Sequence, residues 1–217
     1  MRLIFEQLRA GGDRNLGYLL GDREAKLGVL IDPSFSPEVF VQRAIDQGLT
    51  ISHIINTHSH PDHTNGNAKA IEFTRAPLAA FVDSPTSPAV PLADGQELAV
   101  GSLRLRFLHT PGHCDDHLVI YEPFHQLLVT GDLVFVGKVG GTGTEESART
   151  EWRSLQRLLR EIPDDTTLWP GHDYGVRPSS TVGLEKQTNP FLICPDVAAF
   201  IQLKSDWPSV KARLGLK

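Results

Sequence analysis

The chain has 217 residues, 40% of them apolar, and a formal net charge of −5. This length and apolar content allow a substantial buried core, in one domain or in two closely fused halves. The net negative charge argues against a general nucleic-acid or anionic-membrane surface. No apolar run approaches the roughly 20 residues that span a bilayer, and the stretch Met1 to Glu6 lacks the long apolar region of a secretory signal. We therefore expect a cytoplasmic protein without nucleic-acid or membrane partners.

The chain opens with a region rich in predicted strands. Three apolar runs separated by glycine-containing turns predict strands over residues 3–8, 17–20 and 27–31. A helix is predicted from Pro37 and ends before Gly48, because apolar residues recur there at helical spacing. The apolar run 51–55 then predicts a buried strand, and residues 63–73 are predicted to form a helix.

The segment directly after the strand predicted at 51–55 is crowded with three histidines and an aspartate. These residues are His58, His60, Asp62 and His63. Neutral imidazoles and carboxylates are the usual ligands for zinc and iron. Side chains alternate in direction along an extended chain, so His58 and His60 can face one ion as a pair. Asp62 and His63 are expected to turn toward a second position.

Three more ligand-type residues follow strand-like runs in the second half of the chain. Beyond the proline-rich connection 84–91, strands are predicted at 98–100, 103–108, 118–121 and 126–130, and an apolar stripe through Trp152 and Leu159 predicts a helix. His113, Asp132 and His172 each come directly after a glycine that ends such a run. Glycine permits the sharp turn that carries the next side chain to a sheet edge.

The number of ligand-type residues indicates a site for two metal ions. Seven candidates are too many for one tetrahedral ion and suit two ions that share a carboxylate. These candidates are His58, His60, Asp62, His63, His113, Asp132 and His172.

At these residues the chain resembles the metallo-β-lactamase fold superfamily and, more narrowly, its glyoxalase II-type hydrolases. The resemblance covers nearly the whole chain. It implies an α+β fold, a four-layer αββα sandwich of two similar halves, with the metals at one edge between the sheets. The predicted unit is a single domain over residues 1–217 with a short C-terminal tail from about residue 175.

The resemblance also implies a role for each ligand. His58, His60 and His113 would hold the first metal, Asp62, His63 and His172 the second, and Asp132 would bridge the two. The lactamases that share the His-x-His-x-Asp-His pattern lack a bridging aspartate, so β-lactamase activity is disfavoured.

The implied activity is hydrolysis of a small-molecule substrate, an acyl thioester, with a metal-bridging hydroxide as nucleophile. Two divalent ions, zinc in the first place and iron or manganese as alternatives, lower the pKa of a bound water from about 16 toward about 7. Asp62 would be both a ligand and the catalytic residue that orients the hydroxide. No Gly-x-Ser-x-Gly motif is present, and the oligomeric state stays open.

Tyr174 and Lys138 are predicted to contact the substrate. Glyoxalase II-type enzymes that act on glutathione thioesters use a basic residue and a tyrosine on the loop after the bridging aspartate, a tyrosine after the last histidine, and basic groups in a C-terminal helical domain. Tyr174 matches the second tyrosine, but Lys138 is out of register, the glycine-rich loop 137–144 has no tyrosine, and the tail is short. S-lactoylglutathione is therefore expected to be a weaker substrate here than for those enzymes.

Three alternatives are kept open. A mononuclear iron persulfide dioxygenase would use His58, His113 and Asp132 as a two-histidine, one-carboxylate triad, although the arginine-containing loop of that family is not found. A phosphodiesterase or RNA-processing hydrolase could use the same ligands, but the acidic balance and the lack of an RNA-binding appendage count against it. A non-catalytic metal-binding module is the third alternative.

The remaining histidines and the two cysteines are predicted to have lesser roles. Cys114 is expected to point away from the metals as a small apolar group, and Cys194 to remain a thiol. His117 is expected to donate or accept a hydrogen bond behind the ligands. The other three, His53, His109 and His125, are predicted to be packed or partly exposed structural residues.

Overall fold

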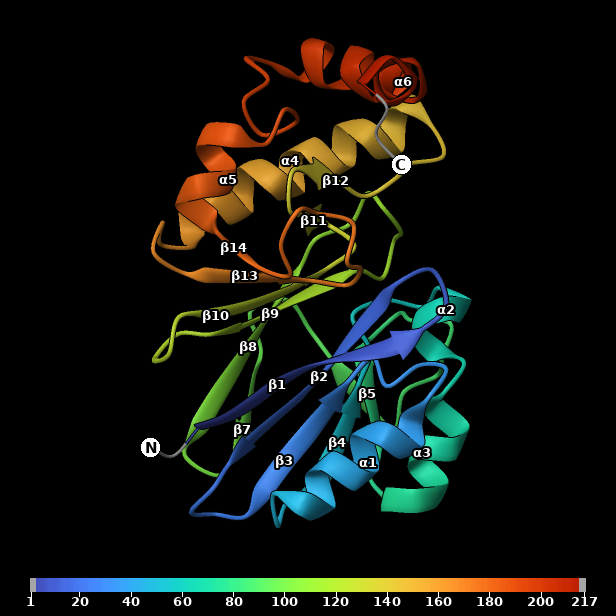
Figure 1. Cartoon of the computed structure of the whole chain (residues 1–217), viewed down its shortest axis with the longest axis vertical. Coiled ribbons are helices and arrows are strands. Elements are labelled where there is room, and N and C mark those ends of the chain that lie inside the picture. Colours follow the sequence, from blue (N-terminus) through green and yellow to red (C-terminus); the bar gives the residue numbers. More distant parts are fainter. Residues whose placement is uncertain (1–2, 215–217) are drawn as a thin grey trace.

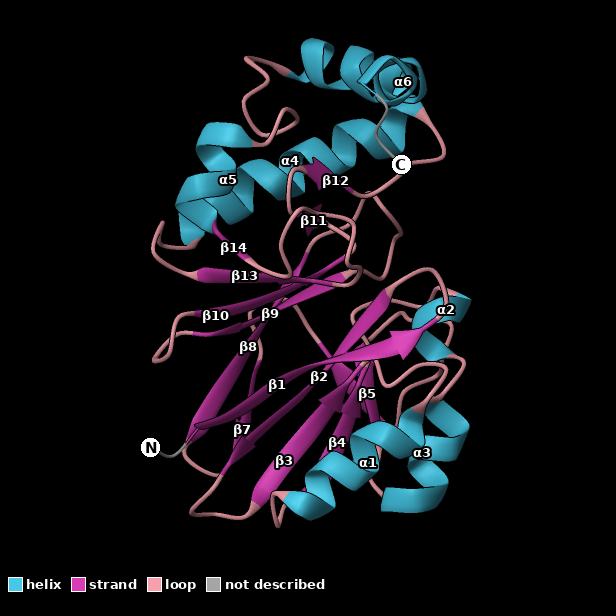
Figure 2. Cartoon of the chain, viewed as in Figure 1, coloured by secondary structure: helices cyan, strands magenta, loops and turns pink. Residues whose placement is uncertain are grey.

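Two β-sheets packed face to face form the centre of the structure, and helices cover the outer face of each sheet (Figure 1). The coordinates are a computed structural model that describes residues 3–214. Residues 1–2 and 215–217, the ends of the predicted 1–217 domain, lie outside the described residues. The layers run helix, sheet, sheet, helix, which confirms the predicted αββα sandwich (Figure 2).

The first sheet contains six strands in the order of the chain. Its first three strands are antiparallel, and the third to the sixth run parallel. The strands are β1 (Leu3–Gly11), β2 (Asn15–Asp22), β3 (Leu27–Ile31), β4 (Thr50–Ile55), β5 (Leu78–Phe81) and β6 (Val90–Leu92). Every residue of β2 is buried, because one face packs on the second sheet and the other on helices.

The second sheet also has six strands, in the order β14-β13-β10-β9-β8-β7. Its strands are β7 (Glu97–Val100), β8 (Leu103–His109), β9 (Leu118–Glu122), β10 (Leu127–Gly131), β13 (Thr167–Pro170) and β14 (Ser180–Thr181). A separate hairpin, formed by β11 (Val134–Phe135) and β12 (Lys138–Val139), follows β10.

Six helices complete the described chain between residues 3 and 214: α1 (Pro37–Asp46), α2 (Pro61–Thr64), α3 (Asn67–Thr74), α4 (Glu145–Glu161), α5 (Val182–Thr188) and α6 (Val197–Leu214). Helix α4 begins directly after the glycine-rich loop because Thr144 and Ser147 form a capping box. Helices α1 and α3 lie on the first sheet, whereas α4 to α6 lie on the side of the second (Figure 1).

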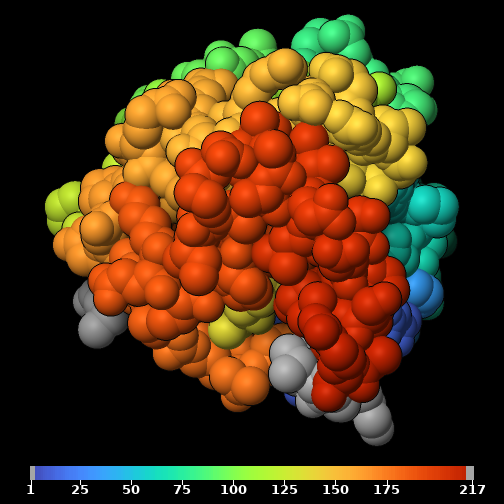
Figure 3. Space-filling model, turned by 90° about the horizontal axis from the view of Figure 1, so that it is seen from above, coloured from blue at the N-terminus to red at the C-terminus, as the bar shows by residue number. Residues whose placement is uncertain are grey.

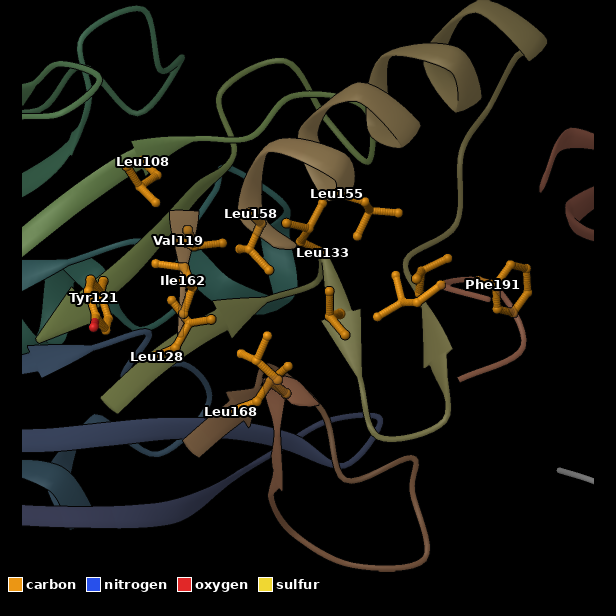
Figure 4. Close-up of a cluster of buried hydrophobic side chains, with 14 of the residues drawn as sticks. Leu108, Val119, Tyr121, Leu128, Leu133, Leu155, Leu158, Ile162, Leu168 and Phe191 are labelled. Carbon is orange, nitrogen blue, oxygen red and sulfur yellow. The ribbon is translucent and has the colours of Figure 1, made fainter. Parts of the chain in front are cut away.

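Three buried apolar clusters hold these layers together. The inner cluster lies between the sheets and includes Tyr18 and Phe107. A second cluster joins α1 and α3 to the first sheet. The third joins α4 to the second sheet, where Leu155 and Leu158 point onto Leu128 and neighbouring strand residues (Figure 4). Each sheet is therefore fixed on both faces, and the loops at its edge start from rigid strands.

The helix predicted over residues 63–73 is wrong in one respect, because the chain forms two helices there. Helix α2 ends at Thr64 and α3 starts at Asn67. At the break, a Cβ atom on Gly66 would lie 2.1 Å from the carbonyl oxygen of Pro33. This tertiary contact requires glycine and overrides the continuous helical pattern.

No helix in the described part of the chain, residues 3–214, combines the length and apolar character needed to cross a membrane. The predicted C-terminal tail from about residue 175 contains β14, α5 and α6. Helix α6 packs on α4 through Phe200 and Trp152. The tail is thus attached beside the metal-ligand loops described below.

Asp22 links the turn after β2 to the turn between β7 and β8, and its loss is expected to destabilise the fold. Its carboxylate accepts hydrogen bonds from Ser102 N and Ser102 Oγ at 2.7 and 2.6 Å, and from the backbone of Glu24 and Ala25. The hydrogen bonds from Ser102 hold the pKa of Asp22 well below its usual value. Asp22→Asn loses charge-assisted hydrogen bonds, each of which contributes about 1.5–3 kcal/mol. The substitution is expected to lower the free energy of unfolding at pH 7 by about the contribution of one such bond.

The effect should depend on pH. A depressed carboxyl pKa contributes stability that is present above the unfolded-state pKa of about 4 and is lost as the pH falls toward the folded-state value. Urea unfolding of parent and Asp22→Asn at pH 7 and pH 3 is therefore expected to show a smaller difference at pH 3. An equal difference at both pH values would contradict the role of the Asp22 charge.

Candidate metal centre

The seven predicted ligand residues meet at one edge of the sandwich, because the strands that precede them end there. Strands β8, β10 and β13 run in the same direction, since β9 is antiparallel to both β8 and β10 and β13 is parallel to β10. Strand β4 of the other sheet ends nearby. Backbone hydrogen bonds join the sheets at this edge, from Leu118 N to Thr57 O and from Leu16 N to Gly171 O.

A first ligand group consists of His58, His60 and His113. His58 Nε2 and His113 Nε2 each lie 3.0 Å from His60 Nδ1. Metal–nitrogen bonds of about 2.0–2.1 Å in tetrahedral geometry place neighbouring ligand atoms about 3.3 Å apart. Both of these separations from His60 Nδ1 therefore suit neighbouring ligands of one ion.

A second group consists of Asp62, His63 and His172. His63 Nε2 lies 3.3 Å from His172 Nε2. Asp62 Oδ2 lies 3.7 Å from the first of these atoms and 3.4 Å from the second. These separations again match neighbouring ligands of one ion.

Asp132 lies between the two groups. Its Oδ2 is 3.6 Å from His113 Nε2 and 3.3 Å from His172 Nε2, and its Oδ1 is 3.4 Å from His63 Nε2. Asp132 is almost fully buried, and its Oδ1 accepts no hydrogen bond from the described residues. A buried carboxylate oxygen without a donor is rare in proteins unless an ion satisfies it, so the residues present fit a pair of metal ions.

Two of the glycines before the ligands are required by close approach. A Cβ atom on Gly171 would lie 2.4 Å from Asp132 Oδ1, and one on Gly131 would lie 2.8 Å from His117 Nε2. Gly131 also has a positive φ of 48°, which favours glycine. Gly171 therefore leaves the space that Asp132 occupies, and Gly131 leaves space for the His117 ring behind it.

Hydrogen bonds from the opposite ring nitrogen orient four of the five histidines. His63 Nδ1 donates to Asp32 Oδ2 at 2.9 Å, His172 Nδ1 to Asp13 O at 2.8 Å, and His113 Nδ1 to Gly141 O at 2.8 Å. Thr57 Oγ1 donates to Asp32 Oδ2 and so accepts from His58 Nδ1. In a neutral ring each bond places the proton on Nδ1 and leaves Nε2 free to bind a metal, and it aims Nε2 at the ligand group.

Two residues that orient the candidate ligands by hydrogen bonds were not predicted from the sequence. Asp32 is buried and fixes both His63 and Thr57. Asn15 donates from Nδ2 to Asp62 Oδ2 at 2.9 Å. The only sequence signal for Asp32 is its position directly after a predicted strand, and Asn15 gives no signal at all.

Charges and burial in the centre favour the ligand forms of His58 and Asp132 and the protonated form of His63. Burial, aided by His63, lowers the pKa of His58 well below its usual value. Burial alone would raise the pKa of Asp132, but His63 and the hydrogen bond from His172 outweigh it and hold that pKa well below its usual range. Burial would lower the pKa of His63, but Asp132 and Asp32 raise it well above normal. A metal ion bound by His63 would take the place of the proton that these two carboxylates favour.

His117 makes the predicted hydrogen bond behind the ligands. Asp132 N donates to His117 Nε2 at 3.1 Å, and His117 Nδ1 donates to Thr110 Oγ1 at 2.8 Å. Burial, together with His113, lowers the pKa of His117 well below its usual value. His117 is thus a neutral ring that fixes the backbone N–H of Asp132.

The expectation that Cys114 points away from the metals is wrong. Its Sγ atom lies within 4.8 Å of ligand nitrogens of His58 and His60. The chain turns at Cys114 instead of continuing as a strand, so side chains no longer alternate. The thiol donates to Asp116 Oδ1 at 3.2 Å, and burial, aided by Asp116, raises its pKa.

The remaining three histidines contact neighbouring side chains away from the ligand groups. His109 stacks on Phe81 with ring centroids 3.9 Å apart, and His125 Nδ1 lies 2.9 Å from Glu122 Oε2. His53 Nδ1 lies 3.1 Å from Ser52 Oγ. These contacts agree with the structural roles predicted for the three residues.

The two predicted substrate contacts lie beside the second ligand group. Tyr174 stacks on His172 with ring centroids 4.7 Å apart and donates from its hydroxyl to Asp13 Oδ2 at 2.7 Å. Lys138 Nζ lies 3.7 Å above the Tyr174 ring. Asn189, fully buried, donates to Lys138 O and so holds the hairpin that carries the lysine.

The glycine-rich loop lies beside His113, whose Nδ1 donates to Gly141 O. It lines a cavity of about 580 Å³ together with Lys204 and Trp207 of α6. Figure 3 shows this end of the molecule, where the C-terminal segment lies beside α4. A Cβ atom added at Gly141 or Gly143 would meet no other atom of the described chain within 4 Å.

Comparison with known proteins agrees with this geometry. The sequence profile of the metallo-beta-lactamase superfamily matches residues 11–84 and 73–172. A hydroxyacylglutathione hydrolase of Rhodospirillum rubrum is 34% identical over 173 residues, which are 78% of this chain. The matched part of the chain spans 66% of the length of that enzyme, just under two thirds.

Two crystal structures are similar over most of this chain. ETHE1 from Myxococcus xanthus is 32% identical with a TM-score of 0.87, over 94% of this chain and 91% of that one. TTHA1623 in a di-iron-bound form is 31% identical with a TM-score of 0.71, over 86% of this chain and 100% of that one.

Proposed function

The chain belongs to the metallo-beta-lactamase superfamily, and from this premise we propose that it is a binuclear metal-dependent hydrolase of a small acyl thioester. The observation that carries the proposal is the position of Asp132, whose two carboxylate oxygens face both ligand groups. The similarity to a hydroxyacylglutathione hydrolase supports the thioester class. Zinc is the proposed metal, with iron or manganese as alternatives, because histidine and carboxylate suit all three.

When bound, the ions supply a water of lowered pKa and a Lewis acid for the substrate carbonyl. The chain's own residues then position the reaction. Asp62 is partly exposed, with 38% of its side chain accessible, and is fixed by Asn15. It would accept a hydrogen bond from the attacking water and orient it toward the carbonyl carbon.

Lys138 and Tyr174 would bind the thiol half of the substrate. Both line a cavity of about 380 Å³, which Arg14 and Lys211 also line. Burial lowers the pKa of Lys138, and the nearby Lys211 and Arg14 lower it further. With Arg177, four cationic side chains and one carboxylate, Glu185, line this small cavity, and this excess of positive charge favours a substrate part that carries a carboxylate.

A second candidate is the persulfide dioxygenase reaction. The similarity to ETHE1 of Myxococcus xanthus extends over nearly all of both chains. His58, His113 and Asp132 would then form the iron triad, and the second ligand group would have no metal role. A phosphodiesterase and a non-catalytic module have no comparable support. We also propose that the protein acts in the cytoplasm on a small-molecule substrate, without nucleic-acid or membrane partners.

A substrate panel on one metal-analysed sample tests the function. The panel contains S-lactoylglutathione, an uncharged acyl thioester, a phosphodiester, and glutathione persulfide with oxygen monitoring. Thioester cleavage is expected, with S-lactoylglutathione a weaker substrate than for full glyoxalase II-type enzymes. Oxygen uptake with the persulfide and no thioester cleavage would replace the hydrolase by the dioxygenase.

Lys138→Met tests the anion contact within the same panel. It removes a charge-assisted hydrogen bond, and kcat/KM for S-lactoylglutathione is expected to fall about 10-fold to 100-fold. The uncharged thioester should be unaffected, and Lys69→Met, at an exposed lysine on α3, is the matched control. An equal loss for both thioesters would exclude recognition of the carboxylate.

A further inference from the structure

A buried ion pair connects α4 to α6 next to the first ligand group. Lys204 on α6 donates from Nζ to Glu151 Oε2 on α4, and also to Gly140 O at 2.7 Å. The Glu151 side chain is fully buried, and its Oε1 has no hydrogen-bond partner among residues 3–214. Burial raises the pKa of Glu151 to about 7, although Lys204 opposes this.

Stability alone does not account for this pair. Two charges removed from water recover their desolvation cost only with good geometry and full hydrogen bonding, and Glu151 Oε1 lacks a donor from the described chain. The surroundings on α4 and α6 are apolar, with Leu155 and Phe200 in the same cluster. Apolar side chains at both positions would join the helices equally well.

The helix that carries Glu151 supports the turn before His113. A Cβ atom on Gly112 would lie 2.4 Å from Glu151 Cα, so the backbone of the turn rests on α4 at this residue. One turn further along α4, Ser154 Oγ donates to Pro111 O at 2.7 Å. The backbone that carries the His113 side chain is therefore fixed to α4.

The Lys204 ammonium supports the loop that holds the ring of His113. Lys204 holds the carbonyl of Gly140, and the next carbonyl, Gly141 O, accepts the hydrogen bond from His113 Nδ1. A Cβ atom on Gly140 would lie 2.9 Å from that Nδ1. The His113 ring is thus held between the loop that Lys204 fixes and the turn that rests on Glu151.

We propose that Lys204, which Glu151 holds in place, is a positioning residue for the metal ligand His113, and that this pair connects α6 to the first ligand group. The proposal rests on the proposed metal centre but not on the reaction it performs. It predicts that the C-terminal helix determines metal affinity, although it contributes no ligand.

The test is metal binding to the full-length chain, measured with Zn²⁺ in competition with a chromophoric chelator. Lys204→Met is expected to weaken binding of one equivalent about 10-fold to 100-fold, the range for residues that orient ligands. Lys204→Arg keeps a charged donor and should restore most of the affinity. Lys69→Met, which breaks an exposed pair with Glu38, is the control and should bind as the parent does.

A double variant separates positioning from folding. Lys204→Met alone leaves Glu151 buried without its partner, which also lowers stability. In Glu151→Met/Lys204→Met both charges are gone, so the thermal unfolding midpoint should return toward that of the parent. The bond to Gly140 O is still missing, so the metal affinity should stay low.

Parent-like Zn²⁺ affinity in both Lys204→Met and the double variant would overturn the positioning role. Failure of Lys204→Met to fold leaves the double variant as the deciding measurement. A parent chain that binds no Zn²⁺, Fe²⁺ or Mn²⁺ would overturn the proposed function, and this inference with it. Since affinity is measured without turnover, a dioxygenase activity would leave the inference standing.

Discussion

Asp132→Ala is expected to abolish turnover and to lower metal occupancy at both ligand groups. Asp132 Oδ2 lies 3.6 Å from His113 Nε2, and Oδ1 lies 3.4 Å from His63 Nε2, so the substitution removes the carboxylate that we propose binds both ions. The loss of kcat/KM should exceed the roughly 100-fold seen for residues that only orient ligands. Elemental analysis and steady-state kinetics on the same preparation measure both quantities.

Two variants serve as controls for Asp132→Ala. Asp83→Ala removes an exposed carboxylate and should change neither quantity. Cys114→Ser should also keep metal and turnover, since a serine hydroxyl can still donate to Asp116 in place of the thiol. If the serine variant lost metal while Asp132→Ala kept turnover, the assignment of ligands would be wrong.

Removal of the metals is expected to have the second large effect. The ligands come from loops of both sheets, and the His63 and His172 nitrogens that would share an ion are 109 residues apart in the chain. Ions that bind only the folded chain stabilise it by about 2.7 kcal/mol at a concentration 100-fold above the dissociation constant. Dialysis against a chelator should therefore remove activity and lower the unfolding midpoint together.

Reconstitution gives the contrasting outcomes. Two equivalents of zinc, iron or manganese per chain should restore activity and stability. A single firmly bound iron, with no second ion taken up after supplementation with zinc or manganese, would count against the binuclear hydrolase and for the dioxygenase. Full activity in the chelated protein would exclude a metal enzyme.

Much of the fold and the gathering of the candidate ligands at one edge could be predicted from the sequence because the signals are local. The ligands follow apolar strands directly, and glycine stands before His113, Asp132 and His172. Strand direction then brings them to one edge. The fold prediction needed the resemblance as well, because apolar runs alone do not specify which strands pair.

Other features depend on contacts that no short pattern records. Asp32 orients His63 across 31 residues and Asn15 orients Asp62 across 47. The break at Gly66 depends on the approach of Pro33, and the direction of Cys114 on a turn that the strand prediction did not include. The joining of α6 to the site by Lys204 is equally tertiary, since its partners are 53 and 64 residues away.

The glycine-rich loop has a consequence for how this scaffold can diversify. Gly141 and Gly143 border open space and have no positive φ, so either can accept a side chain without a clash with the rest of the described chain. Their neighbour Gly140 cannot, because a Cβ atom there would lie 2.1 Å from Asp132 O. One short segment thus combines a position that must stay constant for the ligands with two that are free to vary. A side chain introduced at Gly141 or Gly143 would therefore reshape the cavity of about 580 Å³ without meeting a candidate metal ligand.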